Sequence, residues 1–113
     1  MDTITKQNID EIRTLSAPPQ LVKDALGAIF LLLGYSSAQA TDWKLIRKEL
    51  GKRSTDDNSI LNQLKNFQAE KCDPASAKKA KELIGDVTIA QAKSVSLVAS
   101  HFVAWTLNAL NGV

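Results

Sequence analysis

Two consecutive prolines, Pro18 and Pro19, constrain the fold of this chain more than any other feature. A proline inside a helix removes a backbone hydrogen bond and crowds the preceding turn, whereas the first turn of a helix accepts it readily. Before the pair, apolar residues recur at helical spacing at Ile9, Ile12 and Leu15. After the pair, residues 21–33 continue this spacing and are strongly apolar. The sequence therefore predicts a helix that arrives, a corner at the prolines, and a buried helix that leaves.

Helix-end signals divide the remaining sequence into helices, and no segment shows the polar–apolar alternation that is typical of strands. Gly34 is the expected stop of the helix after the prolines. Thr41 and the pair Asp73-Pro74 are typical starts of later helices. Residues 35–40 are rich in small side chains and predict a loop. The sequence thus predicts an all-α fold of about six helices, at about residues 4–15, 19–33, 42–50, 60–67, 74–84 and 88–112.

The last predicted helix is the longest, and it starts at a capping box formed by Thr88 and Gln91. Its inward stripe is predicted to contain Ile89, Ala92, Val95, Ala99, Phe102, Val103, Leu107 and Leu110. Roughly 24 residues at ~1.5 Å each make a helix of ~36 Å, which is longer than the ~30 Å width of a compact domain of this size. We therefore expect both chain ends to project as an antiparallel helix pair. The residues expected to pair are Ile9, Ile12 and Leu15 with Phe102, Leu107 and Leu110.

Composition argues against several functional classes. Hydrophobic residues make up 44% of the chain and charged residues 23%, as in an ordinary globular domain. The net charge of +2 is too small to indicate nucleic-acid binding. The apolar run at residues 29–33 is too short to cross a membrane. Lysines crowd the third quarter of the chain and form either a solvated face or a surface for an acidic partner; they are Lys65, Lys71, Lys78, Lys79 and Lys81.

The residue types needed for catalysis are sparse. His101 and Cys72 are the single histidine and cysteine, so they cannot supply the ligands of a zinc site. The five glycines are scattered, mostly at expected helix ends, rather than gathered in a phosphate-binding loop. Trp43 and Trp105 lie in apolar helical stripes and are expected to be core residues. We therefore expect no catalytic site, no metal and no cofactor in this chain.

Five short motifs follow one another in a fixed order along most of the sequence. They are Ile12-Arg13-Thr14-Leu15 before the prolines, Leu31-Leu32-Leu33-Gly34, Thr41-Asp42-Trp43-Lys44, Asn66-Phe67, and Val95-Ser96 with Trp105. This order resembles the microtubule-binding domain at the tip of the stalk of dynein heavy chains, over about residues 9–110. Two features differ from that family: the segment between residues 70 and 88 is shorter, and Gly85-Asp86 replaces the usual turn before the final helix.

The resemblance implies a small helical bundle on an antiparallel two-stranded coiled coil, which binds the groove between α- and β-tubulin. The register of the coiled coil would set the affinity for the microtubule, and ATP would be hydrolysed in another part of the motor. Residues 1–17 would be the distal end of the first stalk helix, 18–100 the microtubule-binding bundle, and 101–113 the start of the second stalk helix. Such motors work on the cytoskeleton, in the cytoplasm or in the axoneme of a cilium or flagellum, and some carry a light chain on this domain.

The resemblance assigns microtubule binding to three helices. Lys23 matches the basic residue of the helix after the prolines, and Lys65 lies in the third helix of the family's bundle. Family members usually carry Lys or Arg where this chain has Ser94, and Lys93 is adjacent, about 100° round the helix. The alternative function is a non-catalytic helical adaptor that binds another acidic protein. Co-sedimentation with microtubules at two salt concentrations separates the two functions.

Overall fold

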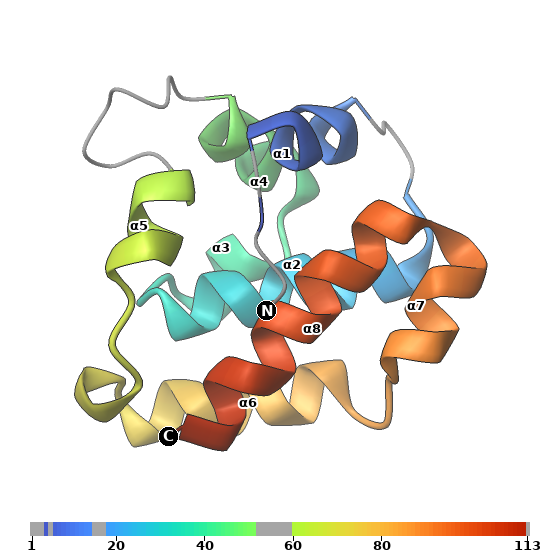
Figure 1. The fold of residues 1–113 in the computed structure, drawn as a ribbon. Coiled ribbons are helices and arrows are strands. Elements are labelled where there is room, and N and C mark those ends of the chain that lie inside the picture. Colours follow the sequence, from blue (N-terminus) through green and yellow to red (C-terminus); the bar gives the residue numbers. More distant parts are fainter. Residues whose placement is uncertain (1–3, 5, 15–17, 52–59, 113) are drawn as a thin grey trace.

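The computed structural model describes residues 4, 6–14, 18–51 and 60–112. Every regular element in this part is a helix (Figure 1). The elements are α1 (Lys6–Arg13), α2 (Gln20–Leu32), α3 (Ser37–Ala40), α4 (Trp43–Leu50), α5 (Ile60–Asn66), the 3-10 helix η1 (Ala69–Lys71), α6 (Pro74–Ile84), α7 (Ile89–Val95) and α8 (Leu97–Gly112). The expected all-α fold is confirmed. None of the described helices is long and apolar enough to cross a membrane.

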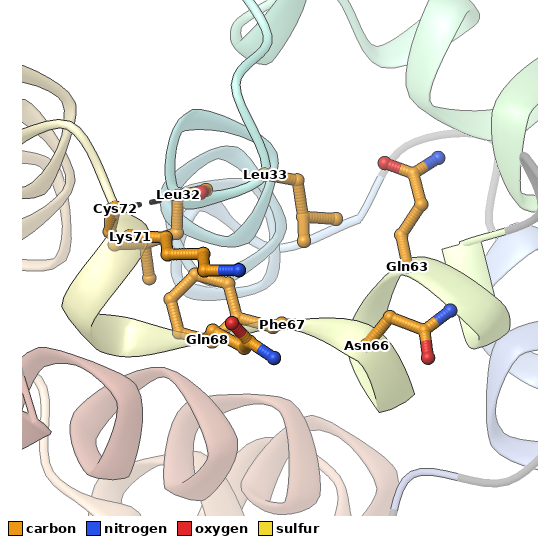
Figure 2. A pocket seen from close by; sticks show the side chains of 8 residues that line it. All are labelled: Leu32, Leu33, Gln63, Asn66, Phe67, Gln68, Lys71 and Cys72. Carbon is orange, nitrogen blue, oxygen red and sulfur yellow. Dashed lines mark hydrogen bonds between the residues drawn. The ribbon is translucent and has the colours of Figure 1, made fainter.

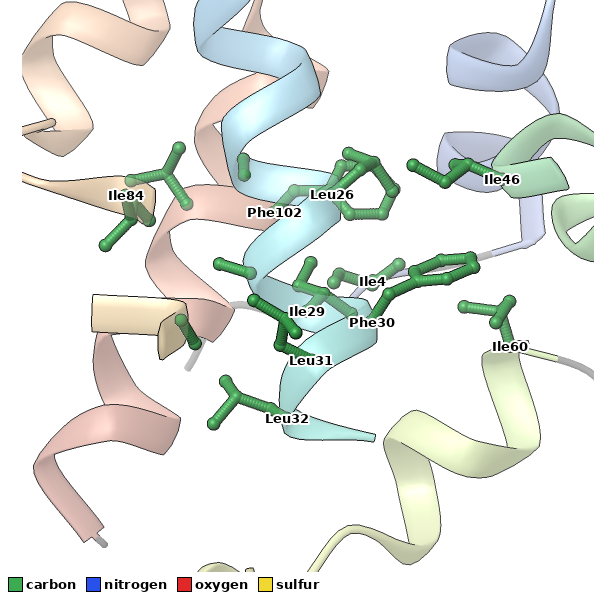
Figure 3. Packing of buried hydrophobic residues seen from close by; sticks show 14 of the residues in the cluster. Ile4, Leu26, Ile29, Phe30, Leu31, Leu32, Ile46, Ile60, Ile84 and Phe102 are labelled. Atoms are coloured by element: carbon green, nitrogen blue, oxygen red, sulfur yellow. The ribbon is translucent and has the colours of Figure 1, made fainter. Parts of the chain in front are cut away.

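The helix after the prolines, α2, is the centre of the bundle. The Pro19 carbonyl accepts hydrogen bonds from the backbone N–H groups of Val22 and Lys23 at 3.0 and 3.2 Å. The prolines therefore stand just before the first turn of α2, where their missing N–H groups would have no partner within the helix. Nine of the 13 residues of α2 are buried: Val22 and residues 25–32. Since α2 packs against α3, α4, α6 and α8, the prediction of a central buried helix is confirmed (Figure 3).

Two glycines set how closely α2 is packed and where it ends. A Cβ atom at Gly27 would lie 2.7 Å from Leu83 Cδ2 of α6 and 2.9 Å from the backbone oxygen of Ala40 in α3. Only glycine therefore allows these three helices to approach one another this closely. Gly34 follows the last turn of α2 with a φ of +102°, a conformation that favours glycine. The predicted stop at Gly34 is confirmed.

The segment predicted to be a loop contains a short helix, α3. Ser36 and Gln39 form a capping box, because Ser36 Oγ accepts from the Gln39 N–H at 3.2 Å and the Ser36 N–H donates to Gln39 Oε1 at 2.9 Å. The next helix, α4, is capped by Asp42 and not by Thr41, since the Asp42 carboxylate accepts from backbone N–H groups of the first turn. The expected loop at residues 35–40 and the expected cap at Thr41 are therefore wrong.

The single long helix predicted from Thr88 onward is two helices, α7 and α8, which meet at Ser96. Ser96 has an extended backbone, with φ −167° and ψ 138°, and its Oγ accepts a hydrogen bond from the Val98 N–H at 3.2 Å. The predicted capping box of Thr88 and Gln91 is present. Together with α3, this break raises the number of α-helices in the described part from the expected six to eight.

The break at Ser96 changes which side chains of the last segment are buried. Ile89 and Val95 were expected in the buried stripe, but they are 38% and 43% exposed. The reason is that α7, which the extended Ser96 separates from α8, packs against α8 as a short helix with Ala92 buried, and the helical spacing restarts at Leu97. The expected inward residues of α8 are buried or half-buried; they are Ala99, Phe102, Val103, Leu107 and Leu110.

The expected projection of the chain ends is not seen in the described part. The principal extents are 32, 31 and 30 Å, and the 16 residues of α8 at ~1.5 Å each span only about 24 Å. Helix α1 lies against α8, as expected, and also against α4. Ile9 and Ile12 of α1 are buried in the common core, while Leu15 lies outside the described residues. An antiparallel stalk that continues α1 and α8 stays a prediction.

Candidate functional site

The four residues predicted to bind microtubules lie on three helices, and all four are exposed. Lys23 is in the first turn of α2, Lys65 is near the end of α5, and Lys93 and Ser94 are in α7. Helix α5 lies at the left of Figure 1, whereas α7 and the start of α2 lie at the right. The structure therefore brings the helices of Lys23 and Lys93 to one side of the bundle and leaves Lys65 on another.

A cavity of about 380 Å³ lies where the start of α2 meets the corner between α7 and α8. Its lining residues come from the end of α1, the start of α2 and that corner: Glu11, Ile12, Thr14, Pro19, Val22, Val95, Ser96 and Val98. The proline corner and the Ser96 corner therefore face each other across one cavity. Lys23 directly follows one lining residue in the sequence, and Lys93 is two positions before another. The cavity thus joins the two elements that carry these cations.

Ser94 provides no charge on α7, and its hydroxyl is engaged within the helix. Ser94 Oγ donates to the Gln91 carbonyl oxygen at 2.6 Å. Such a bond turns a serine side chain back along its own helix. Lys93 is the single cation of α7 and is exposed. The cationic character of α7 therefore depends on Lys93.

Three large apolar residues are markedly exposed in the described part, and all of them lie on α7 or at the first position of α8. Ile89 is 38% exposed, Val95 43% and Leu97 64%. Neighbouring exposed apolar side chains are typical of surfaces that contact another protein, and Val95 and Leu97 lie only two positions apart. The sequence pattern did not predict this apolar edge, because it favoured one unbroken helix with Ile89 and Val95 facing inward.

Lys23 also lines a smaller cavity of about 230 Å³ between α2, α4 and α6. The half-buried Trp43 and the buried Ile46 contribute to its wall. On its rim, Gln20 Nε2 donates to Asp24 Oδ1 at 2.8 Å. At the start of α2, Lys23 is therefore next to Asp24, whose carboxylate accepts a hydrogen bond from the Gln20 amide.

A groove of about 450 Å³ lies between α5, η1 and the end of α2 (Figure 2). Lys65 directly precedes Asn66, one of the residues that line this groove. Phe67 forms part of its wall and packs edge-on against Trp105, with ring centroids 5.2 Å apart. Cys72 also lines this groove. Burial raises the pKa of the Cys72 thiol, and the nearby Asp73 charge raises it further. The thiol is therefore mostly protonated near neutral pH and a poor nucleophile.

The described residues offer the chemistry of binding. No three His, Cys, Asp or Glu side chains among them are placed to hold a metal ion. The start of α2 and helix α7, which border one cavity, instead carry two exposed lysines and exposed aliphatic side chains. Such an arrangement suits the surface of an acidic protein.

No protein-family model matches the chain. Dynein heavy chains are similar to it over nearly its whole length. Cytoplasmic dynein 2 heavy chain 1 of Caenorhabditis elegans is 32% identical over 107 residues, which cover 91% of this chain and 2% of that protein. The cytoplasmic dynein heavy chain of Drosophila melanogaster is 34% identical over 108 residues, 93% of this chain and 2% of that protein. Dynein axonemal heavy chain 17 of Homo sapiens is 28% identical over 112 residues, 96% of this chain and 2% of that protein.

The matches cover 91–96% of this chain, and so nearly all of the segment that carries the motifs. The chain spans only about 2% of the length of the dynein heavy chains it matches. The helical structure agrees with the bundle that the resemblance implied. This chain is a relative of the dynein heavy chains and corresponds to one short segment of them.

Proposed function

We propose that this chain is a microtubule-binding domain of a dynein motor and binds the groove between α- and β-tubulin. The observation that carries the proposal is the identity of 32–34% with cytoplasmic dynein heavy chains over 91–93% of the chain. The order of the motifs and the all-helical bundle support it. Hydrolysis of ATP would belong to other parts of the complete motor.

The surface that meets the microtubule lies, in this proposal, at the corner between α2 and α7. Lys23 and Lys93 are exposed on the two elements that the 380 Å³ cavity joins. Val95 and Leu97 supply exposed aliphatic area next to Lys93. Cations would steer and orient the acidic tubulin surface, and the aliphatic side chains would add contact area. Lys65 would take part only where the contact extends to α5.

Helices α1 and α8 would continue as the two strands of an antiparallel stalk. The contact between α1 and α8 supports this part of the proposal. Residues 1–17 would belong to the first strand and residues 101–113 to the second, with the bundle at 18–100. A shift of α1 along α8 would move the proline corner and, with it, the start of α2 that carries Lys23. In this way the register of the stalk would change the affinity for the microtubule.

The relatives include dyneins named as cytoplasmic and as axonemal. We therefore place the proposed motor on the cytoskeleton, in the cytoplasm or in the axoneme of a cilium or flagellum. In an axonemal setting, a dynein light chain on this domain would be a further partner.

Co-sedimentation with polymerised microtubules tests the proposal directly. We expect the purified chain to pellet with microtubules, with an affinity that falls as salt is raised, because salt screens exposed charges. Actin filaments serve as a control polymer and should pellet little of the chain. If microtubules pellet none of it, the proposal is wrong. If both polymers pellet it equally, the chain is an adaptor for acidic partners in general and not a microtubule-binding domain.

A further inference from the structure

The outward face of α4 carries three cations and no carboxylate. Lys44, Arg47 and Lys48 fall within about 100° of the helix circumference, and all three are exposed. The Asp42 carboxylate is engaged at the start of α4, where it accepts from backbone N–H groups at 3.1 and 3.4 Å. Glu49 points to another side of the helix and accepts a hydrogen bond from a tyrosine hydroxyl at 3.3 Å. The printed partners of these two acids are thus backbone N–H groups and a tyrosine hydroxyl.

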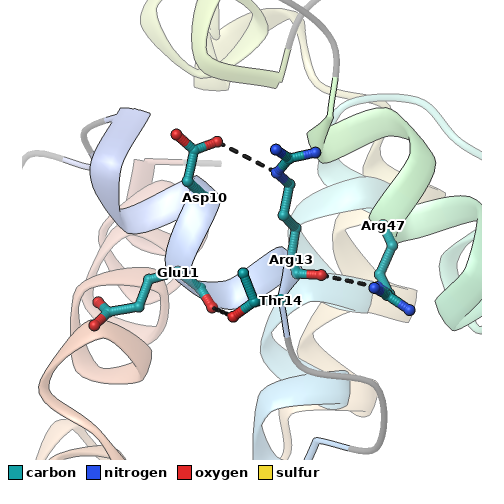
Figure 4. A network of polar contacts seen from close by, with 5 residues as sticks. All are labelled: Asp10, Glu11, Arg13, Thr14 and Arg47. Carbon is teal, nitrogen blue, oxygen red and sulfur yellow. Dashed lines mark hydrogen bonds and ion pairs between the residues drawn. The ribbon is translucent and has the colours of Figure 1, made fainter.

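Arg47 also ties α4 to the end of α1. Arg47 Nε donates to the Arg13 carbonyl oxygen at 2.8 Å, across 34 positions of sequence (Figure 4). The Arg13 side chain is held in turn, because its Nε lies 3.3 Å from Asp10 Oδ1. Both contacts are made through Nε, so the terminal nitrogens of the two guanidinium groups can serve a further acceptor. Two arginines from neighbouring helices are therefore oriented before any partner arrives.

The cations of α4 and the end of α1 form one surface, which we name the α1–α4 basic surface; it consists of Arg13, Lys44, Arg47 and Lys48. Asp10 is the carboxylate beside it, and its charge is paired with Arg13. No ion pair joins Lys44 or Lys48 to another residue of the described part. These four cations lie together in a chain whose net charge is only +2.

We infer that the α1–α4 basic surface binds an acidic peptide, rich in Glu or Asp, of a partner protein. A guanidinium group held in a fixed orientation can fork onto a carboxylate, and the two lysines add attraction over a longer range. The eight residues of α4 span only about 12 Å, the length of a few acidic residues and much less than a nucleic-acid track. The inference does not rest on microtubule binding, because Lys23 and Lys93 lie on other helices.

A fluorescein-labelled peptide of eight glutamates is the probe, and its fluorescence anisotropy is titrated with the full chain. We expect saturable binding that weakens when salt is raised. The double variant Lys44→Gln, Lys48→Gln leaves the bond between Arg47 and Arg13 intact, and it should weaken binding by about fivefold or more. The matched control is Lys78→Gln, Lys81→Gln, which removes two exposed lysines from α6 and should change the affinity by less than about twofold.

Three results would overturn the inference. In the first case, the parent chain does not bind the peptide. In the second case, both double variants lose the same affinity, which means that the peptide responds to net charge alone. In the third case, a short DNA duplex would displace the peptide at a lower concentration than unlabelled octaglutamate does, which assigns the surface to nucleic acid. Arg47→Lys adds a geometric readout, since it keeps the charge but loses the fork, and it should weaken binding about two- to threefold while the protein stays folded. Microtubule co-sedimentation is read separately, so either proposal can fail without the other.

Discussion

The chain turns twice beside the same cavity, at Pro18-Pro19 and at Ser96, but the two corners are held in different ways. At the first corner, the proline ring fixes φ and removes the N–H group, so the turn is built into the covalent structure. At the second corner, Ser96 has an extended backbone that any residue can adopt, and a hydrogen bond from the Val98 N–H to Ser96 Oγ holds the start of α8. The first corner therefore depends little on its surroundings, whereas the second depends on one side chain and on packing.

The largest effect on stability is expected at Ile12, a core residue that lines the cavity between the two corners. Ile12 is 2% exposed and lines the shared cavity. Ile12→Ala should lower the free energy of unfolding by about 2–4 kcal/mol, because it removes buried methyl groups and leaves a void. The control, Val95→Ala, lines the same cavity from the Ser96 side but is 43% exposed, and it should cost less than about 1 kcal/mol. Urea unfolding followed by circular dichroism measures both, and equal losses would mean that the two sides of the cavity are equally buried.

A smaller effect is expected at the Ser96 corner itself. Ser96→Ala removes the acceptor for the Val98 N–H and should lower the free energy of unfolding by about 1 kcal/mol. Ser94→Ala is the control, because it also removes a serine hydroxyl from an exposed part of α7 but no helix cap. It should stay within about 0.5 kcal/mol of the parent. If Ser96→Ala is as stable as the parent, the corner is held by packing alone.

A similarly small effect is expected on the microtubule affinity that the proposed function assigns to α7. Ser94→Arg would add a guanidinium next to Lys93 that can fork onto a carboxylate of tubulin. We expect binding to tighten by about 0.5–1.5 kcal/mol at low salt and this gain to shrink as salt is raised. Lys93→Ala should weaken binding, because Lys93 is the single cation of α7. Co-sedimentation at two ionic strengths measures both variants, and unchanged binding by both would remove α7 from the contact with the microtubule.

The two corners also show what the sequence can and cannot predict. The proline corner and the stop at Gly34 were predicted correctly, because both follow from backbone geometry that the residue type imposes. The break at Ser96 was missed, since serine is compatible with a helix and apolar residues continue on both sides of it. The short helix α3 has a capping box of the same type as Thr88, but four residues are too few to show a helical period.

The positions of the candidate site residues in the fold followed in part from the sequence, and their role in microtubule binding stays a prediction. Lys23 was expected in the first turn of the central helix, and the structure places it there with an exposed side chain. The apolar edge of Ile89, Val95 and Leu97 was not expected, because burial was inferred from the period of an unbroken helix. The hydrogen bond from Arg47 to the Arg13 carbonyl joins residues 34 positions apart, and no local sequence pattern predicts such a contact.

The central claim is that the chain binds microtubules through the start of α2 and helix α7, which border one cavity. The most direct test compares the double variant Lys23→Glu, Lys93→Glu with the double variant Lys78→Glu, Lys81→Glu on α6 by co-sedimentation at low salt. Both variants change the net charge equally, so long-range attraction falls by a similar amount in each. We predict a loss of affinity of at least about tenfold for the first and less than about threefold for the second, with the helicity of both unchanged. Equal losses in the two variants, or full binding by the folded first variant, would contradict the proposed site.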